Sequence, residues 1–503
     1  MKPARSAGEV ERFRTAIARE LGLQFEDARL SLLENLLDRR ALARGCDRSS
    51  YLAGLESGAP REERAALAQE LTVPETYLFR HIDQFHAFRD VALPELLLAP
   101  RAAGRVRVLS AGCASGDEAY SVAILLREAG AEPSPQVFVR GVDVNPAVLE
   151  RAHRARFGSW ALRETPPEVQ RRWFREEGRE LVLDASVRRL VSFDERNLVA
   201  DDAELWGEGR YDVVFLRNVS MYFTPDHARG VVARIARALV AGGYLFLGHA
   251  ETLRGLSHDF SLRQHHGAFF YQRKQAELQP FTEPSADAAA LCAASEGVAP
   301  EAGPGRADAS RRASQRIRTP RADDESGAPA GAARRVAPEL AATLDLLGRE
   351  RFGQALDSLQ QLSSDASQQP DPLLLQAVLL AQSGDLSRAE KVCRELLELD
   401  ELNAGAHYAL ALCHEGAGER RGAAAHDRAA IYLDPAFSMP RLHLGLLARR
   451  AGDVAGARRE LVQALVLLER EDASRVLLFG GGFRREALIA LCRAELAICG
   501  KGL

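Results

Sequence analysis

A strand, a tight turn and a helix follow one another near residue 110, and this order constrains the fold most. Residues 106–109 form a short apolar run, and a small-residue turn at 111–116 separates it from a helical pattern that opens with Asp117 and Glu118. Small residues let the backbone approach a ligand closely, and a helix N-terminus offers free N–H groups. A phosphate-binding loop normally adds a basic residue. The acids here favour a cationic or hydroxyl-bearing ligand instead, such as a nucleoside that carries an amino-acid sulfonium.

A second apolar run ends in another acid. Residues 137–142 are predicted to form a strand, and Asp143 follows directly. A carboxylate at the end of the second strand is well placed to bind the hydroxyls of a ribose. On these two segments alone, a plain glycine turn followed by an unrelated acid stays open as the alternative.

Apolar runs and helical patterns alternate between residues 105 and 273, which predicts a mostly parallel sheet with helices on both faces. The expected strands are 105–110, 137–142, 190–193, 211–216, 243–248 and 268–272, and the expected helices are 117–129, 146–155 and 225–240. Residues 181–193 are predicted to be short strands of an insertion rather than a crossover.

Charge and cysteine usage exclude several classes of function. The net charge of the 503-residue chain is −4, which gives no bulk electrostatic case for nucleic-acid binding. The seven cysteines are scattered without a CxxC pair, so we expect a reducing compartment and no structural zinc. The N-terminal sequence lacks the apolar core of a signal peptide, and no run of about 18 apolar residues exists to span a membrane. We therefore expect a cytoplasmic protein.

The C-terminal third of the chain contains an internal repeat. Before it, residues 274–338 are dominated by small, polar and charged residues and Pro, a composition that cannot bury enough apolar surface to fold. Small residues then recur every 34 positions, at Ala355, Ala389, Ala423 and Ala457 and at Gly384, Gly418 and Gly452. This period resembles the tetratricopeptide repeat, in which a small residue lets two helices cross closely. We expect three full repeats, a partial one that starts near Ala341, and a closing helix at 483–499; a plain helical bundle is the alternative.

Five segments within residues 10–273 carry a second resemblance. They are LTVPETYLFR (71–80), SAGCASGDEAYSVA (110–123), GVDVNPAVLERA (141–152), the pair Asn197 and Leu198 with RNVSMYF (217–223), and GHAETL (248–253). Together they resemble the CheR family of chemoreceptor glutamate methyltransferases, which use S-adenosylmethionine. The resemblance implies a Rossmann-like α/β methyltransferase domain with an all-α N-terminal domain, followed by the repeats as an all-α solenoid. We place the domains at 1–95, 96–273 and 339–503, with a disordered linker at 274–338.

The resemblance also implies roles for single residues. The residues implied to bind S-adenosylmethionine are Thr76, Arg80, Gly112, Glu118, Asp143 (at the ribose hydroxyls), Asn197, Leu198, Arg217 and Asn218. Arg80 and Tyr222 are implied to position the acceptor. No metal site is expected, because His249, His265 and His266 have no carboxylate or Cys partner at ligand spacing.

Three positions depart from the family pattern. Pro74 stands where the family often has Asn, which removes one polar contact to the cofactor. Leu78 stands where the family often has Phe, directly before Phe79 and Arg80, and Ala119 replaces a Pro after the acidic pair. None of these changes removes a residue implied in catalysis.

Methyl transfer to a glutamate needs positioning more than it needs a base. The acceptor carboxyl has an ordinary pKa of about 4.3, so it is ionised at neutral pH. Holding its oxygen about 3–3.5 Å from the methyl carbon is worth roughly 7–11 kcal/mol. Arg80 can hold the carboxylate with a fork of N–H donors, and the Tyr222 hydroxyl can orient the attacking oxygen. The alternatives are a surface arginine and a core aromatic residue.

The N-terminal region is predicted to be helical, because leucines recur at helical spacing at Leu30, Leu33, Leu36 and Leu37. The arginines Arg39, Arg40 and Arg44 lie on one predicted helix and either contact an acidic receptor helix or form a solvated face.

The resemblance implies that the partner is the helical cytoplasmic domain of a chemoreceptor. The repeats are expected to bind a receptor or a signalling protein. They are also expected to replace the tail-peptide binding of some relatives, because the insertion at 181–193 is short. Two alternatives stay open: a cofactor-sensing adaptor without transferase activity, and a methyltransferase that acts on another protein or a small molecule.

Overall fold

The computed structural model describes most of the chain. It describes residues 3–98, 105–275 apart from 135, 250 and 266, residues 343, 345 and 346, and residues 351–361 and 368–500. They belong to two compact units, Met1–Glu251 with Asp259–Glu277, and Thr252–His258 with Leu278–Leu503. The predicted linker at 274–338 lies outside the described residues from 276 onward.

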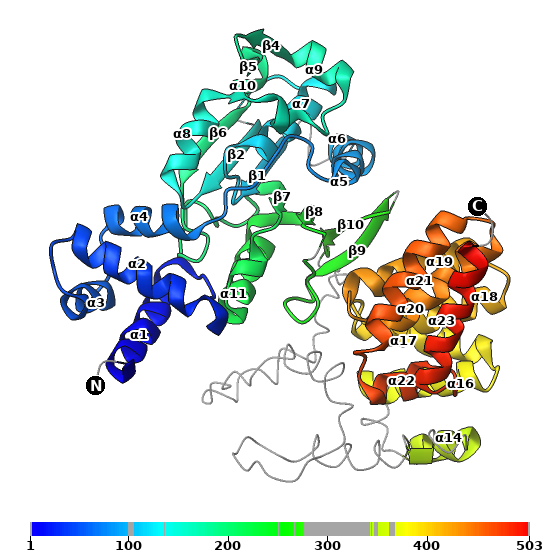
Figure 1. Ribbon diagram of the computed structural model, residues 1–503. Coiled ribbons are helices and arrows are strands. Elements are labelled where there is room, and N and C mark those ends of the chain that lie inside the picture. Colours follow the sequence, from blue (N-terminus) through cyan, green and yellow to red (C-terminus); the bar gives the residue numbers. More distant parts are fainter. Residues whose placement is uncertain are drawn as a thin grey trace, which may run out of the picture. The chain divides into compact units, whose positions relative to one another are not determined.

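The first unit begins with a helical region (Figure 1). Its elements are α1 (Pro3–Leu21), η1 (Asp27–Arg29), α2 (Leu30–Ala43), α3 (Arg48–Glu56) and α4 (Arg61–Leu71). Leu33, Leu36 and Leu37 of α2 share one buried core with Phe13 and Ile17 of α1. The leucine spacing therefore predicted the buried face of α2 correctly.

The two arginines of α2 and Arg44, which follows the helix, contact carboxylates of their own domain. Arg40 makes a bidentate pair with Glu63 of α4 at 2.8 Å, and Arg44 lies 3.8 Å from the same carboxylate. Arg39 pairs with Glu70, also on α4. The sequence analysis left two roles open for these arginines, contact with a receptor or a solvated face. Their positive charge is largely neutralised by the glutamates of α4.

Glu63→Gln should destabilise the N-terminal helices by about 3 kcal/mol, because it leaves a largely buried arginine without its counter-charge. Glu63 is 2% exposed and also accepts a hydrogen bond from the Tyr51 hydroxyl at 2.7 Å. Thermal unfolding of the full chain measures the effect, and Glu62→Gln, at an exposed neighbour on α4, is the control. Equal shifts in the two variants would contradict the assignment.

The same pair makes the stability depend on pH. Burial alone would raise the pKa of Glu63, but the hydrogen bonds from Arg40 and Tyr51 outweigh burial and hold it below its ordinary value of 4.5. A lowered folded-state pKa stabilises the protein above pH 4.5, and this contribution is lost as the pH falls through the folded-state pKa. The Glu63→Gln variant should lack this acid-sensitive part of its unfolding profile.

The rest of the unit is built on a seven-stranded sheet of order β6-β2-β1-β7-β8-β10-β9. The strands are β1 (Val106–Ala111), β2 (Val137–Asp143), β6 (Val191–Glu195), β7 (Tyr211–Leu216), β8 (Leu239–Leu247), β9 (Phe260–His265) and β10 (Ala268–Arg273). The first five in this order pair in parallel, and β10 pairs antiparallel with both β8 and β9. The predicted mostly parallel sheet is confirmed. β9 was missed, because its side chains are mostly half-buried and form no apolar run.

Helices pack on this sheet (Figure 1). They are α5 (Ile82–Ala87), η2 (Phe88–Ala92), α6 (Leu93–Leu98), α7 (Asp117–Glu128), α8 (Pro146–Arg154) and α11 (Pro225–Ala238). Phe85 and Phe88 pack on Phe215 of β7, with ring centroids 6.0 and 5.7 Å apart, and Phe246 of β8 stacks on Phe215 at 4.6 Å. This aromatic core ties α5 to the sheet directly after the turn that carries Arg80.

The insertion is longer than the sequence suggested, and its predicted limits of 181–193 are wrong. A separate three-stranded sheet of order β3-β5-β4 is formed by β3 (Arg156–Phe157), β4 (Phe174–Glu177) and β5 (Glu180–Leu183), with η3 (Ser159–Leu162), α9 (Pro167–Trp173) and α10 (Ala185–Arg188) around it. Residues 191–193 belong instead to β6 of the main sheet, where Val191 pairs with Val139. The sequence did not predict this small sheet, because β4 consists mostly of charged residues and has no apolar face.

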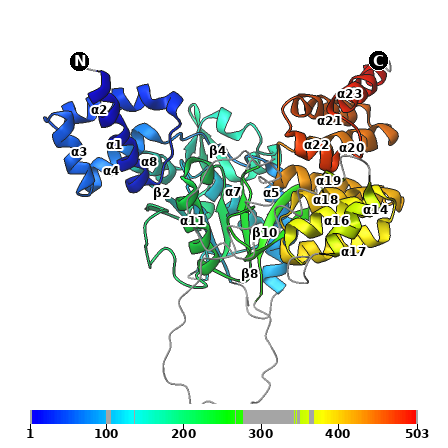
Figure 2. The same cartoon turned by 90° about the horizontal axis from the view of Figure 1, so that it is seen from below.

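The second unit consists of helix pairs (Figures 1 and 2). The helices are α14 (Phe352–Gln360), α16 (Pro370–Gln382), α17 (Leu386–Leu399), α18 (Ala404–Gly416), α19 (Arg420–Leu433), α20 (Ser438–Arg450), α21 (Val454–Leu468), α22 (Ala473–Phe479) and α23 (Arg485–Gly500). The periodic alanines are fully buried, and the periodic glycines follow the first helix of each pair with φ between 81° and 85°. The repeat pattern thus has the structural basis that its period predicted. The short helix α22 was not predicted.

None of the helices in the described parts of the chain is both long and apolar enough to cross a membrane.

Candidate active site

One cavity of the first unit gathers every residue that the sequence assigned to the site. It lies where β1, β2 and β7 end, the edge at which open α/β sheets bind ligands. The assigned residues in its walls are Thr76, Arg80, Gly112, Glu118, Asp143, Asn197, Leu198, Arg217, Asn218 and Tyr222. The end of α1 adds two apolar residues, Leu21 and Leu23, that sequence reasoning missed.

The turn after β1 forms the floor beside β2. Ala111 pairs with Val142, and the Gly112 N–H donates a hydrogen bond to the Val142 carbonyl at 2.8 Å. Gly112 has a φ of 77°, and a Cβ at this position would lie 2.5 Å from Val219 Cγ2. Both the backbone conformation and the close approach therefore require glycine here.

Asp143 is held at the end of β2 by backbone donors. Its two oxygens accept hydrogen bonds from the Ala114 and Asn145 N–H groups, each at 2.9 Å. Burial raises the pKa of Asp143, while these hydrogen bonds act in the opposite direction. Because a carboxylate can accept about four hydrogen bonds, the group keeps capacity for the hydroxyls of a ligand in the cavity.

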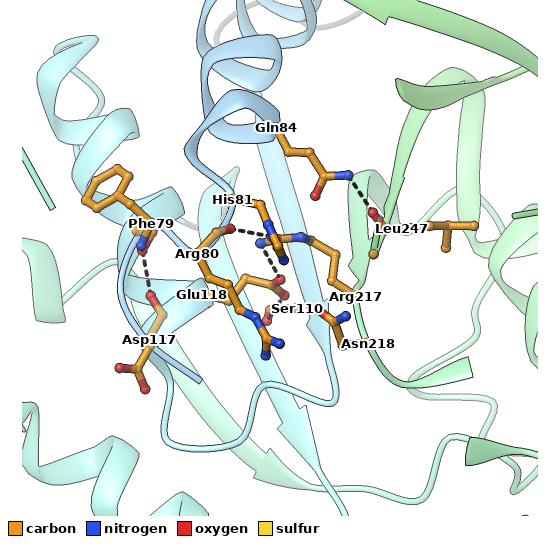
Figure 3. A network of polar contacts seen from close by, with 12 residues as sticks. Phe79, Arg80, His81, Gln84, Ser110, Asp117, Glu118, Arg217, Asn218 and Leu247 are labelled. Carbon is orange, nitrogen blue, oxygen red and sulfur yellow. Dashed lines mark hydrogen bonds and ion pairs between the residues drawn. The ribbon is translucent and has the colours of Figure 1, made fainter. Parts of the chain in front are cut away.

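Glu118 and Arg217 form an ion pair in the cavity wall (Figure 3). Arg217 Nη1 lies 3.1 Å from Glu118 Oε2, and the Ser110 hydroxyl donates to Glu118 Oε1 at 2.7 Å. Burial raises the pKa of Glu118, and the positive charge of Arg217 opposes that rise. Arg217 also donates to the Arg80 carbonyl, so the pair fixes the backbone that carries Arg80.

The turn around Arg80 is held in an unusual conformation. Phe79 and His81, on either side of it, both have a φ of 58°, which non-glycine residues rarely adopt. The Phe79 N–H donates to the Ser121 hydroxyl at 2.9 Å, and Gln84 Nε2 donates to the Leu247 carbonyl at 2.6 Å (Figure 3). These contacts, together with Arg217, determine where the Arg80 side chain leaves the backbone.

The Arg80 side chain makes few polar contacts with the rest of the protein. Its Nη1 donates to the Glu75 carbonyl at 2.8 Å, and its guanidinium lies 5.7 Å from the centre of the Tyr77 ring. Its Nε is buried without a hydrogen-bond partner among the described residues, as is the Nε of Arg217. The positive charge of these two residues in the cavity wall suits an anionic group.

The backbone around Tyr222 is held by hydrogen bonds to the segment that follows α1. It lies in η4 (Ser220–Tyr222), and its carbonyl accepts a hydrogen bond from the Gln24 N–H at 2.8 Å. The Thr224 N–H donates in turn to the Gly22 carbonyl at 3.0 Å. The side chain is 38% exposed, which excludes a core aromatic role. The segment that follows α1 therefore helps to build the site, a contribution that the sequence did not reveal.

Asn197 joins the cavity wall to the N-terminal helices. Its Nδ2 donates to the Glu20 carbonyl at 2.7 Å, and its Oδ1 accepts from the Val199 N–H at 3.1 Å. Its neighbour Leu198 is buried and apolar. Within the cavity, Asn197 thus acts first as a structural tie and Leu198 as an apolar surface.

The described residues contain no group of three or more His, Cys, Asp or Glu side chains that could hold a metal ion. His249 packs on His81 with ring centroids 4.1 Å apart, and burial lowers the pKa of His81 to about 4. His266 lies outside the described residues.

The sequence that forms this cavity matches a known protein family. Residues 74–269 match the family model described as "CheR methyltransferase, SAM binding domain". A "Probable biofilm formation methyltransferase WspC" of Pseudomonas putida is 30% identical over 462 residues, which span 89% of this chain and 96% of the relative. The chain belongs to the CheR methyltransferase family. WspC of Pseudomonas aeruginosa is 30% identical over 89% of this chain and 96% of its own length, and a chemotaxis protein methyltransferase of Vibrio parahaemolyticus is 33% identical over 45% of the chain and 82% of its own.

The cofactor of this CheR protein is S-adenosylmethionine, and the cavity suits it. Asp143 offers acceptors for hydroxyl groups, and the positively charged Arg80 and Arg217 in the cavity wall suit a carboxylate. Because residue 112 is glycine, the turn after β1 can pack closely against Val219 in the cavity wall. Both ends of an amino-acid-bearing nucleoside thus have complementary groups in one cavity.

Proposed function

We propose that this CheR protein transfers the methyl group of S-adenosylmethionine to glutamate side chains in the helical cytoplasmic domain of a chemoreceptor. The products are a glutamate methyl ester and S-adenosylhomocysteine. The observation that carries the proposal is that Arg80 and Tyr222 line the same cavity as Asp143. The relatives that are named as chemotaxis protein methyltransferases support the same substrate class.

The proposed roles divide the cavity between cofactor and acceptor. Bound S-adenosylmethionine supplies a methyl group that its sulfonium activates for displacement. Asp143 binds the ribose hydroxyls, and Gly112 allows close approach of the backbone. The residues that enclose the adenine and the methionyl group are Thr76, Glu118, Asn197, Leu198, Arg217 and Asn218.

On the acceptor side, Arg80 holds the glutamate carboxylate and Tyr222 orients the oxygen that attacks. No residue needs to act as a strong base, because the acceptor is already ionised at neutral pH. A fully buried arginine–carboxylate pair would stabilise the ground state and slow the transfer. The partial exposure of Arg80 and Tyr222 is consistent with residues that orient the carboxylate without burying its charge.

The proposal is tested by transfer of labelled methyl from S-adenosylmethionine to purified cytoplasmic fragments of chemoreceptors. We expect base-labile label on the wild-type fragment, because carboxyl methyl esters hydrolyse in base. A fragment whose candidate glutamates are replaced by glutamine should remain unlabelled. Label that survives base, or that appears only on a small molecule, would show that another acceptor is used.

We also propose that the repeats, within 339–503, recruit the receptor or a signalling protein. The expected replacement of tail-peptide recognition loses its ground, because the insertion is not short but carries the sheet β3-β5-β4. The helix pairs α16–α21 support recruitment, because stacked pairs present an extended surface to a partner. A tethered module raises the effective concentration of the acceptor without new contacts at the cavity. Binding of residues 335–503 to a receptor that lacks its tail is the expected result; the absence of binding would contradict recruitment of the receptor by the repeats. The boundaries at 95, 273 and 338 and the cytoplasmic location belong to the same proposal.

A further inference from the structure

A buried carboxylate behind the cavity has no part in the chemistry described above. Glu251 is 3% exposed and does not line the cavity. It belongs to the GHAETL segment, which resembles the family without an assigned role. Its oxygens accept hydrogen bonds from the N–H groups of Asn218, Val219 (2.9 Å), Met221 (3.3 Å) and Gly248 (2.8 Å) and from the Ser220 hydroxyl (2.7 Å).

Four of these donors belong to one loop, residues 218–221, which forms part of the cavity wall. Asn218 and Val219 of this loop line the cavity, and Tyr222 follows it directly. Asn218 has a φ of 59°, in the left-handed region. A residue other than glycine pays of order 1 kcal/mol or more for this conformation, so it persists only where surrounding contacts fix it. Hydrogen bonds from N–H groups to a carboxylate are stronger than those to a neutral acceptor.

Gly248 makes room for this arrangement. A Cβ at residue 248 would lie 2.6 Å from Glu251 Oε2 and 2.9 Å from the Asn218 nitrogen. The carboxylate can therefore reach the loop only because residue 248 has no side chain. This requirement links two residues of the GHAETL segment to the geometry of the loop.

We propose that Glu251 is a positioning residue of the methyl transfer, which fixes the loop 218–221 and thereby the placement of Tyr222 and Asn218 in the cavity. The inference rests on the proposed function, because Tyr222 is the acceptor-positioning residue there. Glu251 contacts the loop but not the cavity, so its effect on the reaction passes through Asn218 and Tyr222.

The test uses Glu251→Gln in the full-length protein. Glutamine preserves the shape of the side chain but replaces one carboxylate oxygen, an acceptor, with an NH2 group. This NH2 group would face backbone N–H groups that donate to Glu251 in the wild-type protein. We expect kcat for transfer to a receptor fragment to fall on the order of 10²-fold, since small displacements of positioning groups have effects of this size. The affinity for S-adenosylhomocysteine should also fall, but less, because Asn218 is only one of the residues proposed to enclose the cofactor. Glu95→Gln is the matched control, because Glu95 accepts from the Tyr244 hydroxyl and Arg263 but lies outside the cavity wall.

Two further measurements separate positioning from a general loss of structure. Tyr222→Phe should lower kcat in the wild-type background but have little added effect in Glu251→Gln, because residues that act as one unit are not additive. Amide hydrogen exchange at 218, 219 and 221 should become faster in Glu251→Gln and unchanged in Glu95→Gln. Ser220→Ala removes one donor to Glu251 without changing charge, and we expect it to lower kcat less than Glu251→Gln does. This variant keeps the test possible if Glu251→Gln fails to fold.

An unchanged exchange rate at these amides, or an equal Tyr222→Phe effect in both backgrounds, would overturn the proposal. If the wild-type protein labels no receptor fragment, the proposed function fails, whereas the exchange measurement still decides whether Glu251 holds the loop.

Discussion

Replacing Arg80 with alanine should lower methyl transfer to a receptor fragment about 10²–10³-fold, since the substitution removes the group proposed to hold the acceptor carboxylate. The guanidinium is available for this role because, among the described residues, its only hydrogen bond is the one that Nη1 donates to the Glu75 carbonyl. The turn itself should persist, because Arg217 donates to the Arg80 backbone carbonyl and not to its side chain. Single-turnover transfer of labelled methyl measures the loss, and titration with S-adenosylhomocysteine should show a smaller loss of cofactor affinity.

Arg163→Ala is the matched control for this prediction. Arg163 also stacks on Tyr77, 3.4 Å from the ring centre, but it is exposed and lies outside the cavity wall. Arg80→Lys should give an intermediate rate, since lysine keeps the charge but loses the planar fork. If Arg163→Ala slowed transfer as much as Arg80→Ala, the effect would belong to the Tyr77 surface and not to a grip on the acceptor.

The central fold was predictable because its strands are buried on both faces. All six residues of Tyr211–Leu216 are buried, and the strand appears in the sequence as an apolar run that only Asp212 interrupts. β4 and β9 have mostly half-buried or exposed side chains, and such strands leave no comparable pattern. The period of the repeats was equally readable, because Ala389 and its equivalents must be small where helices cross.

The parts of the site that lie in short sequence motifs could be predicted. The parts that depend on contacts between segments far apart in the sequence could not. Gly112 follows β1 and Asp143 ends β2, and these two strands pair directly, so the proximity of the two residues follows from the topology. The hydrogen bond between Gln24 and Tyr222 joins segments far apart in sequence, and no local pattern announces it. The pairing of Arg40 with Glu63 is similar, because the sequence does not show that α4 packs beside α2.

Asp143→Asn should weaken binding of S-adenosylmethionine about 10–100-fold. Hydrogen bonds to a charged group contribute about 1.5–3 kcal/mol, and each 1.4 kcal/mol corresponds to a tenfold change in affinity. The amide also presents its NH2 group to the Ala114 or Asn145 N–H that the carboxylate now accepts. Calorimetric titration with S-adenosylhomocysteine measures the change without requiring an acceptor.

Asp194→Asn is the control, because Asp194 lies at the same level of the sheet but outside the cavity. It is on β6, where it pairs in register with Val142, and its carboxylate accepts from Arg140 at 2.7 Å. Equal losses of affinity in the two variants would remove Asp143 from the cofactor site. The wild-type protein should also lose affinity as the pH falls through the pKa of Asp143, which burial raises above its ordinary value of 3.8. Asp143→Asn should show a weaker acid dependence, since the amide does not titrate and Glu118 remains as a cavity carboxyl whose pKa is raised by burial. This difference separates loss of a charged acceptor from distortion of the turn.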